Sequence, residues 1–177
     1  MSQLQDGDAR RTASATELDS GAASSEEYLW YVGRALHEML SIAAELGDGR
    51  VCIRPTLPGA NTAYGLITHC LGVADYWLGA LIAGRVVERD RAAEFAATGT
   101  VASLIHAVTA AITQMGTDLR SLESATPPRT EPDPSFLGPR RPLSQAGVLL
   151  HVLEELAQHH GQLEVLRDVL LLQQDVV

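Results

Sequence analysis

Four long segments of this 177-residue chain carry apolar side chains at helical spacing, and none of the intervening segments alternates apolar and polar residues as a strand would. The predicted helices cover residues 25–46, 62–84, 101–122 and 144–173. Aromatic residues make up only 5% of the chain, which favours helices over a sheet. The predicted fold class is therefore all-α, a four-helix bundle.

Helix-capping and helix-breaking residues mark the ends of these segments. Ser24 or Ser25 can cap the first helix, because two glutamates follow in its first turn. The connections after residues 84 and 122 are long, and the second is too rich in proline for a regular element. These lengths leave open whether successive helices alternate in direction. Residues 1–23 are polar and small, so we predict a disordered tail followed by one domain over residues 24–177.

Charge and cysteine content exclude several classes of function. The formal net charge of −9 argues against a nucleic-acid partner or an anionic membrane surface, since either needs a basic patch. The chain has only two cysteines and no Cys-x-x-Cys spacing, which is typical of a reduced protein. It contains neither an uninterrupted apolar run of about 18–20 residues nor the apolar core of a signal peptide. We therefore expect a cytoplasmic protein with no membrane partner.

The last predicted helix carries ionisable residues on its apolar face, in the stretch HVLEELAQHHGQLEVLRD. On a helical wheel, one side collects Val148, Val152, Leu156, Leu163, Leu166 and Leu170. His159 falls at the centre of this stripe, Glu155 lies one turn before it and His151 one turn earlier. His160 points about 100° away, and Glu154 points further outward.

A carboxylate and a histidine on the same buried face need partners. Burying an ionised carboxylate is costly unless a cation compensates it. Glu155 and His159 therefore either hydrogen-bond to each other or hold a metal ion, because side chains at i and i+4 converge. His69 lies among apolar residues of the second predicted helix and has no partner in that helix. It is either a core histidine or a third ligand.

The chain resembles the DinB-like superfamily, and within it the actinobacterial branch related to mycothiol-dependent maleylpyruvate isomerase and the mycothiol S-transferases. The matching stretches are NTAYGLITHCLGVADYW, then AGR with RDRAAEFAATGT, and finally HVLEELAQHHGQLEVLRD. Together with the helix order they cover most of the chain from about residue 25 onward. The last stretch is the most specific of them.

The resemblance implies a metal site whose ligands are His69, Glu155 and His159. The wider superfamily has histidine where this chain has Glu155, whereas the mycothiol branch has glutamate there. The position after Gly161 is often histidine in that branch, and this chain departs from the pattern with Gln162.

Further residues are candidates for the surroundings of the metal or for the walls of a substrate pocket. These candidates are His151, Gln162, Tyr76, Arg85 and Arg167. The arginines could bind anionic groups of a substrate, as could Arg89 and Arg91; their alternative role is that of ordinary surface residues.

Two histidines and one carboxylate are the ligand pattern of a catalytic zinc site, which leaves a coordination position open. Zinc suits these ligands, and nickel, iron or manganese remain alternatives. The resemblance implies a metal-dependent thiol transferase or thiol-dependent isomerase that joins a low-molecular-weight thiol, mycothiol, to a small electrophile. The alternatives are a non-catalytic metal-binding stress or regulatory module and a metal-dependent hydrolase. The resemblance also suggests a homodimer.

Overall fold

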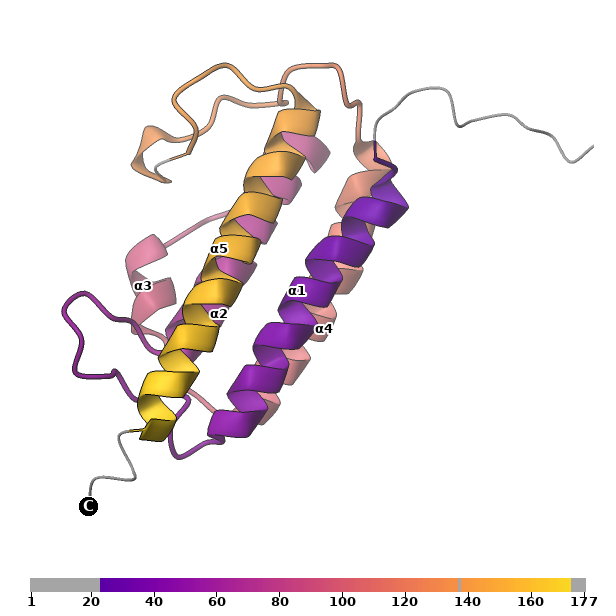
Figure 1. Ribbon diagram of the computed structural model, residues 1–177. Coiled ribbons are helices and arrows are strands. Elements are labelled where there is room, and N and C mark those ends of the chain that lie inside the picture. The colour runs from indigo at the N-terminus through magenta and orange to yellow at the C-terminus, as the bar shows by residue number, and fades with distance from the viewer. Residues whose placement is uncertain (1–22, 137, 173–177) are drawn as a thin grey trace, which may run out of the picture.

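The computed structural model describes residues 23–136 and 138–172, and every regular element in that part of the chain is a helix (Figure 1). The prediction of an all-α bundle is confirmed. Its four long elements are α1 (Ser25–Leu46), α2 (Ala63–Ala74) with its π-helical continuation η1 (Asp75–Ala83), α4 (Val101–Asp118) with the 3-10 turn η2 (Leu119–Ser121), and α5 (Gln145–Leu172). The predicted tail lies almost entirely outside the described residues.

Short polar side chains begin the helices at the predicted places. Ser24 and Glu27 form a reciprocal capping box at the start of α1. The hydroxyl of Thr62 accepts a hydrogen bond from a backbone N–H in the first turn of α2, and the hydroxyl of Thr100 does the same in α4. At the other end of the second helix, Gly84 has a φ of 72°, a left-handed conformation that glycine adopts without strain.

The helices do not simply alternate in direction. The backbone N–H of Val101, at the start of α4, donates to Asp48, just after the end of α1. The hydroxyls of Tyr64 and Ser103, near the starts of α2 and α4, lie 3.0 Å apart. Therefore α2 and α4 run in the same direction, while α1 and α5 run in the opposite one (Figure 1). The long connection after η1 returns the chain to the end of the bundle where α2 begins.

That connection contains a short helix, α3 (Arg91–Ala96), which is not among the four predicted helices. The side chain of Asp90 caps it by accepting from two backbone N–H groups. Six residues are too few for a helical apolar pattern to stand out, so periodicity does not find it. The proline-rich connection likewise includes one 3-10 turn, η3 (Pro134–Phe136), against the expectation of no regular element.

The core lies between the four long helices. Every member of the predicted apolar stripe on α5 is buried, which confirms the wheel. The segment Ala63–Ala83 is long and apolar enough to span a membrane by length and composition alone, but most of it is buried inside the bundle. It packs against α5, so the face of α2 that carries His69 meets the face of α5 that carries the predicted ligands.

Candidate metal centre

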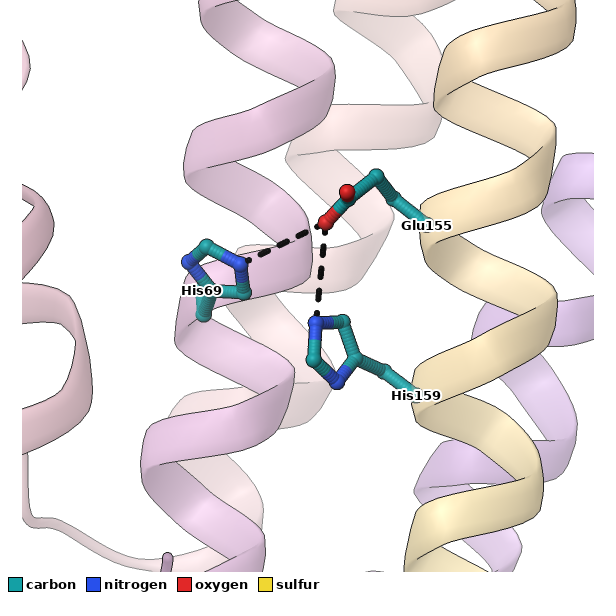
Figure 2. A group of neighbouring side chains, drawn as sticks. All are labelled: His69, Glu155 and His159. Carbon is teal, nitrogen blue, oxygen red and sulfur yellow. Dashed lines mark ion pairs between the residues drawn. The ribbon is translucent and has the colours of Figure 1, made fainter. Parts of the chain in front are cut away.

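Three side chains from two helices converge in the bundle: His69 from α2, and Glu155 and His159 from α5 (Figure 2). The Nε2 atom of His69 lies 3.7 Å from Glu155 Oε2, and the Nε2 atom of His159 lies 3.6 Å from the same oxygen. One ligand atom from each residue lies within 4.8 Å of the others. These residues form a group that could hold a metal ion, and they are the three that the resemblance implied.

Hydrogen bonds on the far side of each imidazole fix its orientation. His69 Nδ1 lies 2.7 Å from Glu94 Oε2, and His159 Nδ1 lies 2.9 Å from the side-chain oxygen of Gln162. Both partners are acceptors, so the hydrogen in each contact belongs to Nδ1. In a neutral ring the lone pair is then on Nε2, which is the atom that faces Glu155.

The electrostatics of Glu155 also suit a cation. Contacts with His159 and His69 hold the pKa of the Glu155 carboxyl well below its ordinary value, against the opposing effect of burial. The group is therefore an ionised acceptor. Its separations from the two Nε2 atoms exceed hydrogen-bond length. When both rings are neutral with their hydrogens on Nδ1, three acceptors face one another, an arrangement that either a proton or a divalent metal ion between them would stabilise, so the donor set fits a divalent metal ion.

A proton competes with a metal ion for the same place. Burial lowers the pKa of His69, but the carboxylates of Glu155 and Glu94 outweigh it and raise the pKa above its ordinary value. A second proton on the His69 ring would occupy Nε2. Because metal ligands must be deprotonated, metal binding at this centre is expected to release protons.

Glu94, on α3, is a residue that sequence analysis missed. Its carboxylate contacts His69 on one side and Arg89 on the other, where Arg89 Nε is 2.7 Å from Oε1. Burial raises the pKa of Glu94, but His69 and Arg89 together lower it below its ordinary value. The next residue, Phe95, stacks on the His69 ring with centroids 4.2 Å apart. The one sequence signal was an isolated acid among alanines and a phenylalanine.

The other ionisable residues of the α5 motif point in different directions from the three ligands. The His151 ring packs edge-on against Trp77, and its Nδ1 is buried without a hydrogen-bond partner among the described residues. Burial lowers the pKa of His151. His160 Nε2 lies 3.9 Å from Glu164 rather than toward Glu155, and the Glu154 side chain is 73% exposed. These directions agree with the wheel.

Three further candidates make contacts of other kinds. The Tyr76 hydroxyl accepts a hydrogen bond from the backbone N–H of Asp133 and so fastens the proline-rich connection to η1. Arg85, which follows the C-terminal end of η1, forms ion pairs with Asp118 of α4 and with Asp75, the first residue of η1. Arg167 forms ion pairs with Asp168 and Glu45. Their roles toward a substrate therefore stay predictions.

The triad is not sealed from solvent. The side chains of Glu155 and His159 are 26% and 15% exposed, whereas that of His69 is 3% exposed. The two ligands on α5 are therefore the part of the triad that solvent reaches.

Comparisons with known proteins identify the family of the chain. No match to the chain was found among curated proteins. The sequence model of the Mycothiol-S-transferase family matches residues 29–171, which include all three residues of the triad and Glu94. This match spans well over half of the chain, so the chain belongs to the mycothiol-S-transferase family.

Proposed function

We propose that the protein is a metal-dependent thiol S-transferase that joins a low-molecular-weight thiol, mycothiol, to a small electrophile. The observation that carries the proposal is the His69–Glu155–His159 cluster, in which three acceptor atoms converge on one point inside a mycothiol-S-transferase fold. A thiol-dependent isomerase is the closely related form of the same chemistry, since both begin with a thiolate that attacks an electrophile.

The three side chains would hold the metal, and each contributes something different. Glu155 supplies a negative charge. The two histidines supply neutral nitrogen ligands, and hydrogen bonds from their Nδ1 atoms to Glu94 and Gln162 fix the orientation of the rings. When bound, a divalent metal lowers the pKa of a coordinated thiol, so that the nucleophilic thiolate is available near neutral pH. Three protein ligands leave a coordination position for that thiol. The protein needs no cysteine nucleophile of its own, and Cys70 is buried, which raises its thiol pKa.

We propose zinc as the metal, because two nitrogens and one carboxylate oxygen match its usual catalytic ligands. Nickel, iron and manganese are the alternatives to be distinguished by metal analysis. The proposed location is the cytoplasm, where low-molecular-weight thiols stay reduced. We also propose a homodimer that pairs through an outer helix face; Trp30 and Tyr31 on α1 are large exposed apolar residues suited to this contact.

The test is a thiol panel on protein purified without chelators. Mycothiol, bacillithiol and glutathione are each offered with monochlorobimane, and the rate is measured with and without the divalent metal. We expect turnover that requires both the metal and a thiol, and that is fastest with mycothiol. His69→Ala serves as the site-deficient control.

Two outcomes favour the alternatives. Metal-loaded protein that turns over none of the thiols across several electrophiles would identify a metal-binding stress or regulatory module. Metal-dependent hydrolysis of a substrate at a rate independent of added thiol would identify a hydrolase that uses the same residues.

A further inference from the structure

The Glu94 carboxylate is shared between a candidate ligand and a buried cation. Glu94 Oε2 lies 2.7 Å from His69 Nδ1 and 3.0 Å from an Arg89 terminal nitrogen, while Oε1 lies 2.7 Å from Arg89 Nε. The Glu94 and Arg89 side chains are only 9% and 3% exposed. The two charges form a bidentate pair, the geometry in which Arg recognises a carboxylate most strongly.

The surroundings hold this pair in one position. The Arg89 guanidinium carbon lies 4.8 Å from the centre of the Phe136 ring, so its outer side is covered by an aromatic face. Gly72, on α2, gives the carboxylate its room, because a Cβ at that position would overlap Glu94 and lie 2.5 Å from its Cδ. Three separate segments therefore cooperate to bring a single carboxylate behind His69.

We propose that Glu94 is a positioning residue of the metal centre. By accepting the Nδ1–H of His69, it keeps the Nε2 lone pair turned toward Glu155 and His159, and its negative charge makes His69 a stronger ligand. Arg89 acts through Glu94 by fixing the carboxylate in a bidentate contact. The inference rests on the proposed function only in that the triad binds a metal ion.

The two histidine ligands are supported unequally. His159 donates a hydrogen bond to the neutral amide of Gln162, an exposed residue. His69 donates to the buried carboxylate of Glu94, which is also paired with Arg89. A carboxylate behind a histidine increases its basicity more than an amide does, because only the carboxylate carries charge. Loss of Glu94 should therefore weaken metal binding more than loss of Gln162.

The experiment measures the zinc affinity of the full chain by competition with a chromophoric chelator, and the visible spectrum of the cobalt-substituted protein. Glu94→Ala should weaken zinc binding by about 10–100-fold, the usual effect of losing such a partner. Glu94→Gln should recover part of this loss, because an amide oxygen can still accept the Nδ1–H. Both variants should shift the cobalt spectrum, which a merely structural role would leave unchanged.

Gly72→Ala is the sharper variant, since it displaces the carboxylate but retains every ligand and every charge. The atoms that a Cβ would meet belong to the Glu94 side chain, which can turn aside, and alanine favours a helix more than glycine does. We expect the same direction of change as for Glu94→Ala. The matched controls are Gly33→Ala, where the nearest atom lies 4.0 Å away, and Glu88→Gln, an exposed glutamate of the same connection; both should bind zinc normally.

The outcomes separate this inference from the proposed function. Zinc affinities of Gly72→Ala and Glu94→Ala within twofold of the unsubstituted chain would overturn the positioning role and leave the proposed function intact. If Glu94→Ala does not fold, Gly72→Ala alone decides the question. Failure of the unsubstituted chain to bind zinc or any other divalent metal would overturn both.

Discussion

Adjacent histidines in the α5 motif should behave in opposite ways when each is replaced. His159→Ala should empty the metal centre, whereas His160→Ala should leave it filled. Exposure alone does not separate the two, because their side chains are 15% and 26% exposed. The directions of the two side chains do distinguish them. His159 Nε2 faces Glu155 at 3.6 Å, while His160 Nε2 lies 3.9 Å from Glu164 on the outer side of the helix.

The size of the effect follows from the number of ligands. Four-ligand zinc sites in small domains bind with roughly 10–16 kcal/mol at neutral pH, or about 3 kcal/mol per ligand. A loss of about 3 kcal/mol weakens binding by roughly a hundredfold. The remaining His69 and Glu155 would then hold the ion too weakly to survive purification. The same loss is expected for His69→Ala and Glu155→Ala, and none for Glu154→Ala.

The assay is the metal content of each purified variant, followed by zinc affinity in a chelator competition. Circular dichroism confirms that each variant keeps the helical content of the unsubstituted chain. An empty site in His160→Ala together with a filled site in His159→Ala would refute the assignment. The helix phase of α5 would then be wrong, and the triad with it.

Other perturbations test the surroundings. Arg85→Ala should lower the free energy of unfolding by about 2 kcal/mol, because the buried Asp118 carboxylate loses its cation and keeps a hydrogen bond from Gln114, and because Arg85 is partly exposed. Urea unfolding measures this change. Unchanged stability with a raised KM for the thiol would instead indicate that Arg85 binds the substrate. Tyr28→Phe should raise the free energy of unfolding by about 1 kcal/mol, because the buried hydroxyl has no hydrogen-bond partner among the described residues, whereas exposed Tyr31→Phe should change nothing. Burial lowers the pKa of His151 below 6.5, so the unfolded chain binds that proton more readily and stability falls as the pH drops below 6.5. His151→Phe in the metal-free protein should reduce this fall; equal pH profiles of urea unfolding for the two proteins would contradict it.

Features that depend only on periodicity within one helix, such as burial and a shared helix face, could be predicted from the sequence. Leu156 and Leu163 are buried, and Glu155 and His159 share a face, because a spacing of three or four residues sets direction whatever the helix packs against. The role of His69 needed more than its own helix, since α2 is apolar almost all round. For that reason the residue stayed undecided until the family resemblance was considered.

The contact of Glu94 with His69 could not be predicted from the sequence, for a different reason. It lies 25 residues from His69 on a six-residue helix, and its approach depends on the absence of a side chain at Gly72. Local pattern carries no information on such a contact. Helix direction was undetermined for the same reason, because the connection after η1 is long enough to return to either end of the bundle.

The pairing of helices divides the bundle into parts with different tolerance for change. All three candidate ligands come from α2 and α5, which pack directly on each other, while α1 and α4 provide none (Figure 1). The separation of Glu155 from His159 is set by their spacing on α5, and the distances from His69 to both are set by how α2 packs on α5. Both α1 and α4 pack on the ligand-bearing helices, so a substitution on either leaves the distances within the triad unchanged when it keeps α2 and α5 in place. Residues of α1 and α4 can therefore differ between relatives with the metal ligands kept, provided that the packing of α2 on α5 is preserved.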